Sequence, residues 1–329
     1  MDSTRLINLL ADIADGQPHE IASLAASHKC SVEKIEADLR HIESMGLLFN
    51  WQGSRVQLLR PLDLLDQETI VGALQPSTLK QLHDIHIGWS VDSTNLQAMR
   101  GIEQGRRHGH VYLAEQQSAG RGRRGRQWVS PVASNIYLSA VWQFNGAGQE
   151  ISTLSLVAGV AVCRALANLG ITDVGLKWPN DILANGKKLG GILLEMQGDP
   201  NRECQVVVGI GLNVYMLDSQ ADTISQPWVD LNSLCSELGA TRNAIVAAVL
   251  DALVQVLSEH KQQGFAGLKE EWQSLDVFAG QDVMIQLGED YIFGVAKGVN
   301  QHGALRLETP SGEQYFHGGE VSLRPMGMI

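Results

Sequence analysis

Residues 120–128 read Gly120-Arg121-Gly122-Arg123-Arg124-Gly125-Arg126-Gln127-Trp128, with four arginines and three glycines in the first seven positions. This stretch cannot build a core, because charged and flexible residues bury little apolar surface. Glycine lets backbone amides approach a ligand closely, and arginine grips phosphate or carboxylate oxygens through paired N–H groups. A disordered Arg-Gly tail that binds nucleic acid is the alternative. We favour an anion-binding loop, because the stretch lies between predicted strands at 111–115 and 135–143.

The charge around this loop is opposite to that of the whole chain. The 329 residues carry a net charge of −11, which argues against general coating of nucleic acid. Between residues 104 and 149, six arginines face a single acid, Glu115, so this segment has a local charge of +5. A positive segment in an acidic protein predicts a dedicated site for an anionic ligand.

Composition indicates an ordinary soluble protein of two or three domains, with 44% hydrophobic and 19% charged residues. The chain has no signal-peptide pattern, and no apolar run approaches membrane-spanning length. We therefore expect a cytoplasmic protein with no membrane association. Paired metal or redox spacing is absent from the cysteines, so we expect reduced thiols and no metal ligands among the site residues. The cysteines are Cys30, Cys163, Cys204 and Cys235.

Residues 1–61 are predicted to form a winged helix-turn-helix domain that binds DNA. Apolar periodicity predicts helices at 4–15, 20–28 and 32–45, and the segments 47–51 and 55–59 read as a hairpin. A domain kept only for packing or dimer contacts remains possible, because residues 1–60 hold eight acids against six basic residues. The candidate DNA contacts are Ser31, Lys34, Arg40, His41 and Arg55.

The rest of the chain is predicted to form an α/β domain over 62–276 and a small all-β barrel over 277–329. Asn185-Gly186 is typical of a tight hairpin turn. Predicted helices of the α/β domain cover 62–74, 96–101, 151–169, 243–263 and 267–275, and its strands include 86–91, 111–115, 135–143, 174–182 and 206–211.

Five motifs in order resemble those of the bifunctional bacterial biotin–protein ligases of the BirA type, which join a ligase and a biotin operon repressor in one chain. The resemblance covers nearly the whole length, and the arginine–glycine block and Lys-Trp-Pro-Asn-Asp are specific together. It implies a mixed-sheet domain of the biotin/lipoate ligase type and a C-terminal SH3-like barrel. The motifs are 92–95, Gln117, 120–126, 177–181 and 188–192.

The resemblance also implies the reaction and its partners. In the family, ATP and biotin form biotinyl-5′-adenylate, and a carrier lysine then attacks the mixed anhydride. Implied partners are the biotin carboxyl carrier protein of acetyl-CoA carboxylase, Mg²⁺, operator DNA and a second copy of the chain when the adenylate is bound. The wing departs from the family pattern, since residues 53–56 read Gly-Ser-Arg-Val.

Residue roles follow by matching the motifs, with a base role for Asp181 left as a hypothesis. Trp228 corresponds to a tryptophan that packs on adenine, or is a surface aromatic. The implied catalytic residues are Arg121, Arg123, Lys177, Asp181 and Lys188. Those for biotin are Ser93, Thr94, Asn95, Gln117, Arg121, Gly122, Arg123 and Lys188, and those for ATP or adenylate are Gly120, Arg121, Arg123, Arg124, Arg126, Trp128, Asn180, Asn213 and Trp228.

Two other functions stay open. A lipoate–protein ligase shares the expected fold and adenylate chemistry, although its loop pattern is Arg-Arg followed by Gly-Gly-Gly. A biotin-sensing transcription factor with weak or no ligase activity would keep the pocket and the DNA-binding domain.

Overall fold

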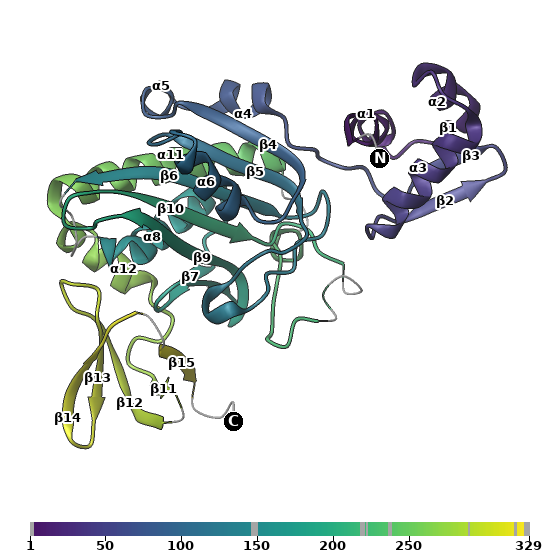
Figure 1. Cartoon of the computed structure of the whole chain (residues 1–329). Helices are drawn as coiled ribbons and strands as arrows, with labels where there is room; N and C mark the ends of the chain where they lie inside the picture. The colour runs from purple at the N-terminus through teal and green to yellow at the C-terminus, as the bar shows by residue number, and fades with distance from the viewer. Residues whose placement is uncertain are drawn as a thin grey trace.

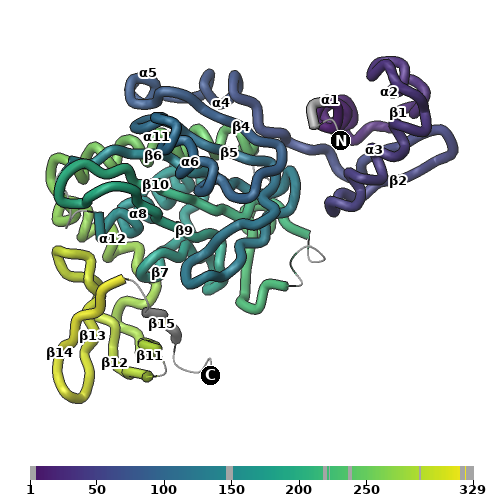
Figure 2. Tube along the Cα trace, in the orientation of Figure 1, coloured from purple at the N-terminus to yellow at the C-terminus, as the bar shows by residue number. Residues whose placement is uncertain are grey.

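The computed structural model describes residues 3–145, 151–217, 221, 223–235, 239–288, 290–318 and 321–325 (Figure 1). The described residues form three sheets of three, seven and five strands, in that order along the chain. The Cα trace shows the first and third sheets on different sides of the central one (Figure 2).

The N-terminal part contains the predicted three helices and hairpin. Leu9, Ile35 and Leu39 are fully buried between the helices, which explains the apolar period of the sequence. A two-residue edge strand, β1, pairs with the hairpin and was not predicted, since it is too short to alternate. The elements are α1 (Ser3–Ile13), β1 (His19–Glu20), α2 (Ile21–Ser27), α3 (Val32–Ser44), β2 (Phe49–Gln52) and β3 (Arg55–Leu58), with sheet order β1-β3-β2.

The prediction of a helix over 62–74 is wrong for its first five residues. The helix α4 (Gln67–Ala73) begins only after Asp66, whose side chain accepts from Thr69 N. Leu62 is buried with the N-terminal core and Leu65 with the central core. An extended segment can serve both cores, whereas one helical face would not. A short helix, α5 (Pro76–Leu79), follows.

The central sheet is mixed, with the order β4-β5-β6-β10-β9-β8-β7. β4 and β5 are parallel, and every other neighbouring pair is antiparallel. A parallel pair needs a crossover, and α6 (Thr94–Glu103) supplies it. The strands are β4 (Asp84–Val91), β5 (His110–Gln117), β6 (Ile136–Asn145), β7 (Val174–Lys177), β8 (Asp181–Ala184), β9 (Lys187–Gly198) and β10 (Glu203–Leu212).

Three helices, α8 (Leu154–Asn168), α11 (Arg242–Gln263) and α12 (Lys269–Leu275), pack on one face, and α6 covers part of the other (Figure 1). The 22 residues of α11 are long and apolar enough to cross a membrane by length and composition, which corrects the prediction that no run approaches that length. Its apolar window is 67% buried, as in a core helix.

The C-terminal part is an antiparallel sheet of five strands in the order β14-β13-β12-β11-β15. Its last strand was not predicted. Trp178 is buried and donates its indole N–H to Gly303 O at 3.1 Å, which fastens this part to the turn between β7 and β8. The strands are β11 (Asp282–Leu287), β12 (Asp290–Val299), β13 (Leu305–Thr309), β14 (Gly312–Phe316) and β15 (Val321–Pro325).

Candidate active site

A cavity of about 150 Å³ lies where the carboxyl ends of β4 and β5 meet the glycine-rich parts of β9 and β10. The start of α6, the arginine–glycine loop and the turn between β7 and β8 enclose it. Fourteen of the predicted residues line it, and Gly120, Asn213 and Trp228 do not. The fourteen are Ser93, Thr94, Asn95, Gln117, Arg121, Gly122, Arg123, Arg124, Arg126, Trp128, Lys177, Asn180, Asp181 and Lys188.

A larger cavity, of about 560 Å³, lies between α5, α11 and the end of β6. It is lined by none of the predicted site residues and by no part of the loop. Volume alone therefore does not identify the site, and the convergence of chemically matched side chains favours the smaller cavity.

Polar side chains are fixed at the N-terminus of α6. Ser93 is the N-cap residue, yet its side chain makes no capping bond although it is buried. The Thr94 backbone N–H donates to Gln117 Oε1 at 2.9 Å, and Gln117 Nε2 donates to Ser130 Oγ at 3.0 Å. These bonds hold Gln117 across from the helix start, where free amides favour an electronegative ligand atom.

Asn95 links α6 to the strands beneath it. Its Nδ2 donates to Glu195 Oε2 at 2.9 Å, and its Oδ1 accepts from Ser139 Oγ at 2.6 Å. A Cβ at Gly209 would lie 2.2 Å from Asn95 Oδ1, so only glycine at that position permits this approach. The sequence predicted Asn95 but missed Ser139, Glu195 and Gly209.

Trp128 lies over two glycines of the sheet. A Cβ on Gly211 would come within 2.6 Å of the indole, and one on Gly191 within 3.4 Å. The indole Nε1 is buried and bonds to no described atom, so it is a donor that a ligand could use. Lys188 Nζ lies 5.6 Å from the centre of the ring, within the range of a cation–π contact.

Asp181 joins two lysines that come from different strands. Lys188 Nζ lies 2.6 Å from Asp181 Oδ1, and Lys177 Nζ lies 3.7 Å from Oδ2. Burial lowers the pKa of Lys177, and the Asp181 carboxylate opposes that shift. Asn185 and Gly186 both have positive φ, as the predicted tight turn requires, and this turn returns the chain so that Lys188 faces Asp181.

Two arginines of the loop are already engaged. Arg123 Nη1 donates to Asn180 Oδ1 at 2.8 Å, and burial lowers the pKa of Arg123 despite the nearby Asp181. Arg121 Nη1 donates to Glu195 Oε1 at 2.9 Å from a more exposed position. The two contacts tie the loop to β9 and to the turn between β7 and β8.

The remaining loop residues shape the loop itself. Gly122 N donates to Arg126 O at 2.7 Å and Trp128 N to Gly120 O at 2.9 Å, which gives the loop a closed stem. A Cβ on Gly120 would lie 2.4 Å from Trp128 O, so this stem needs glycine. Arg124 has φ of 59° and an exposed side chain.

Asn213 and Trp228 act on the backbone around Lys188. Asn213 Nδ2 donates to Val229 O at 3.1 Å and to Lys188 O at 3.4 Å. Trp228 is half-buried, and its backbone forms a bridge with Lys188. Neither side chain lines the cavity in this structure. The glycines Gly191, Gly209 and Gly211 do line it, and they are the feature of the sequence that could have indicated which strands form its wall.

The lysine and the two arginines among the candidates for DNA contact have acidic partners within the N-terminal part. The Lys34 ammonium lies 3.0 Å from Asp38, which is itself buried and also paired with Arg5. Ser31 serves as the N-cap of α3, and His41 is exposed on the same helix. The other two pairs are Arg40 with Glu43 at 2.8 Å and Arg55 with Glu20 at 2.6 Å.

Two family models match the chain. The model described as the biotin/lipoate A/B protein ligase family matches residues 87–213, which include every lining residue of the cavity except Gln226 and Leu323. The biotin protein ligase C-terminal domain matches residues 278–324. The fold and the cavity therefore define a protein of the biotin protein ligase class.

Relatives that align over most of the chain identify the family within this class. The bifunctional ligase/repressor BirA of Escherichia coli (strain K12) is 33% identical over 324 residues, which cover 98% of both chains. A biotin–[acetyl-CoA-carboxylase] ligase of Paracoccus denitrificans is 33% identical, covering 70% of this chain and 96% of its own. This chain belongs to the family of bifunctional ligase/repressors of the BirA type.

A solved structure supports the same assignment. The biotin protein ligase from Aquifex aeolicus in complex with biotin and ATP aligns with a TM-score of 0.63 and 28% identity, covering 74% of this chain and all of its own. The architecture of that ligase is therefore shared over most of the present chain.

Proposed function

We propose that this protein activates biotin with ATP to biotinyl-5′-adenylate and transfers the biotinyl group to one lysine of a biotin carboxyl carrier protein. The observation that carries the proposal is one cavity that joins the polar start of α6 to the half-buried cations Arg123 and Lys188. Membership of the family and the Aquifex aeolicus complex with biotin and ATP support the choice of substrates.

The polar residues at the start of α6 would bind the head of biotin. A ureido group presents one carbonyl acceptor and two N–H donors. Ser93 has a hydroxyl with no capping role, and Asn95 is held rigid by Ser139 and Glu195. Rigid polar partners in a pocket fix the orientation of a ligand at little entropic cost.

The cations would act on the carboxylate and phosphate. A biotin carboxylate oxygen bonds to the α-phosphorus of ATP, the bond to the bridging oxygen breaks, and pyrophosphate leaves. Lys188, Lys177 and Arg123 line this region, and Asp181 is the carboxylate that lies near all three. Their field offsets the repulsion between two anions and stabilises the charge that develops on the phosphate.

In the second half-reaction, the carrier lysine amine attacks the acyl carbon and AMP leaves. The amine must be neutral, so one proton is lost. Asp181 would orient the amine, and its pairing with Lys188 supports a second role, which is to hold that lysine in the cavity. Arg123 would retain the adenylate until the carrier arrives, because it is the most enclosed of the loop arginines.

We propose that Mg²⁺ enters as a complex with ATP. Mg²⁺ prefers carboxylate and carbonyl oxygens and binds mainly through substrate phosphates in such sites. The protein oxygens nearest to the cations, on Asn180 and Asp181, already accept from Arg123 and Lys188. The residues therefore fit a role beside the phosphates rather than an independent metal site.

A second role, biotin-responsive repression of biotin-synthesis genes, follows from the family and from the N-terminal helices and hairpin. We propose a winged helix-turn-helix domain over 1–61, a catalytic domain over 62–276 and an SH3-like barrel over 277–329. When the adenylate is bound, the protein would bind operator DNA and a second copy of the chain. The protein would act in the cytoplasm.

Mass spectrometry of a purified carrier domain tests the ligase role. The carrier is incubated with the protein, ATP, Mg²⁺ and either biotin or lipoate, and the modified lysine is located. We expect biotin on one lysine and no lipoate. Modification with lipoate alone would replace the proposal by a lipoate–protein ligase, and binding of biotin with no transfer would favour a sensor.

A gel-shift series tests the repressor role. Operator DNA is titrated with the protein, with and without the adenylate, at several salt concentrations. Binding that strengthens with the adenylate and weakens steeply with salt supports repression. Replacing Arg55 by Ala should reduce the salt slope by about one if Arg55 contacts a phosphate.

A further inference from the structure

A cluster of histidines lies at the other end of the two parallel strands that carry the cavity residues. Asp84 on β4 is directly opposite His110 on β5, and His86 follows two residues along β4 on the same face. Ser93 follows the far end of β4, and Gln117 is the last residue of β5. The cluster is therefore separate from the candidate active site.

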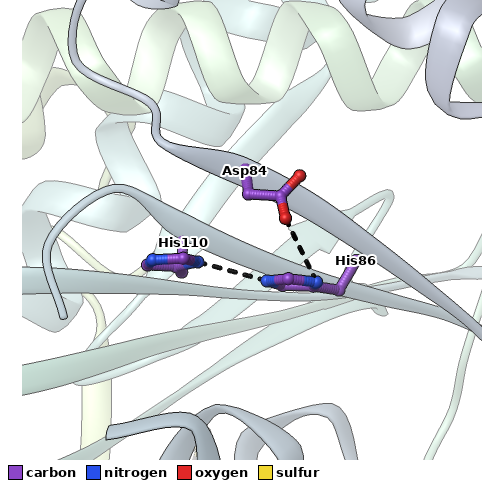
Figure 3. Close-up of side chains that lie close together, drawn as sticks. All are labelled: Asp84, His86 and His110. Carbon is purple, nitrogen blue, oxygen red and sulfur yellow. Dashed lines mark hydrogen bonds and ion pairs between the residues drawn. The ribbon is translucent and has the colours of Figure 1, made fainter. Parts of the chain in front are cut away.

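The side chains of the cluster converge, as the close-up shows (Figure 3). His86 Nε2 lies 3.1 Å from His110 Nδ1, and His86 Nδ1 lies 3.5 Å from Asp84 Oδ2. One ligand atom from each residue lies within 4.8 Å of the others, and this is the one such group found in the described part of the chain. His110 is only 8% exposed, so it is held in place by the fold.

We propose that Asp84, His86 and His110 bind one divalent transition-metal ion such as Zn²⁺, Co²⁺ or Ni²⁺. Two imidazoles and one carboxylate suit these ions and not Mg²⁺ or Ca²⁺, which prefer oxygen ligands. For an ion ~2.1 Å from both His86 Nε2 and His110 Nδ1, the N–metal–N angle would be about 95°. This angle is near those of regular metal coordination, and water molecules would fill the remaining coordination positions.

The contacts of the cluster prepare the nitrogens for a metal. His86 Nδ1 faces Asp84 Oδ2 at 3.5 Å, and a proton on Nδ1 leaves the lone pair of His86 Nε2 on the side of His110. A carboxylate behind a metal-bound imidazole is the usual arrangement that fixes the tautomer and raises the basicity of the ligand. Asp84 can thus act as a ligand or as the partner that orients His86.

Charged groups around the cluster act on a cation in opposite directions. Burial lowers the pKa of His86 and of His110, and Arg106 contributes to both shifts. Arg106 also repels a cation, and Asp84 offsets that charge. His83 stacks on His110 with ring centres 4.5 Å apart and is exposed enough to rotate toward an ion.

A bound ion would cross-link β4 to β5 at the open edge of the sheet. β4 lies at the end of the strand order, and β5 is its one neighbour among the described strands. Binding to the folded state alone raises the temperature of unfolding. The proposal is independent of the ligase reaction, because it involves no residue of the cavity.

The experiment is a metal titration of the full chain, free of any histidine tag and stripped with a chelator. Co²⁺ binding is followed by visible absorption and Zn²⁺ binding by calorimetry, with no substrate present. We expect one ion per chain, a spectrum of nitrogen and oxygen ligands without thiolate bands, and a higher temperature of unfolding.

The variants locate the ion. His86→Gln and His110→Gln should each weaken binding at least a hundredfold, and Asp84→Asn about 10- to 100-fold. His302→Gln, which removes an exposed histidine of the C-terminal part, should bind as the wild type does. Asp84 is half-exposed, so its variant keeps the test valid if a histidine variant fails to fold.

Two results would overturn the proposal. One is a wild-type chain that binds neither ion. The other is folded His86→Gln and His110→Gln, or folded Asp84→Asn, with the stoichiometry and affinity of the wild type. The cluster would then be a hydrogen-bonded pair of imidazoles with no metal.

Discussion

The Lys188 ammonium lies 2.6 Å from one oxygen of Asp181, and the Lys177 ammonium lies 3.7 Å from the other. One carboxylate thus faces two cations, and the guanidinium of Arg123 adds a third at the same cavity. The excess positive charge is what the meeting of a carboxylate and a triphosphate requires.

Replacing Lys188 by Ala should lower kcat/KM for adenylate formation by about 10²- to 10³-fold, the usual cost of removing one donor to a developing charge. Biotin-dependent ATP–pyrophosphate exchange measures it. Lys187→Ala is the matched control, because Lys187 is the exposed neighbour on the same strand and does not line the cavity. Equal losses of kcat/KM in both variants would show that the effect comes from a disturbed β9 and not from the lost Lys188 ammonium.

Replacing Arg123 by Gly should release the adenylate early, because its guanidinium and its bond to Asn180 close the loop. We expect free adenylate in solution and biotin on lysines of an unrelated protein. Arg107→Gly is the control, since Arg107 is an exposed arginine that pairs with Glu203 and does not line the cavity. If the affinity for biotin collapses while release is unchanged, Arg123 belongs to the pocket wall.

A methyl group on Gly211 should displace the indole of Trp128, since a Cβ would lie 2.6 Å from it. Overpacking of this kind costs about 1–3 kcal/mol, so the affinity for a stable adenylate analogue should fall about tenfold or more. Calorimetry measures that affinity. Gly72→Ala is the control, because nothing lies within 4 Å of a Cβ at this helical position. Unchanged affinity in Gly211→Ala would show that Trp128 does not shape the pocket.

Asp276 gives a prediction about pH. Burial raises its pKa from 3.8 to about 6, and its Oδ2 is buried without a described partner. Between these values the folded state binds more protons than the unfolded state, so the free energy of unfolding falls as the pH rises from about 4 to 6. The total loss is of the order of 2–3 kcal/mol.

Asp276→Asn should remove this loss. Denaturant unfolding should show the variant more stable than the wild type at pH 7, with that advantage gone at pH 4. Asp282→Asn, at an exposed acid nearby, should change stability little at either pH. The same difference between Asp276→Asn and the wild type at both pH values would contradict the assignment.

Much of the site could be predicted from the sequence because its chemistry is local. Residue type alone predicts the arginine–glycine loop and the Asn185-Gly186 turn. Glu195 could not be predicted, since an acid near the end of a strand is typical of a solvated face. Glu195 on β9 accepts a hydrogen bond from Asn95 on α6, which is a hundred positions away in the sequence. Its role therefore depends on how these two elements pack.

The partners of individual side chains could not be predicted from the sequence. Lys34 and Arg55 read as cations free for DNA, yet each has a carboxylate within 3.0 Å. Trp228 matches a family contact by position, but its side chain does not line the cavity. Spacing along the chain gives the type of residue, whereas tertiary packing decides what that residue touches.

A single-turnover experiment tests the central claim most directly. Stoichiometric protein, biotin, Mg²⁺ and ATP labelled at the α-phosphate are mixed, and the carrier domain is added afterwards. We predict a labelled biotinyl-5′-adenylate bound to the protein, followed by AMP release in step with biotin transfer to the carrier lysine. Formation of a labelled adenylate with lipoate and none with biotin would contradict the account.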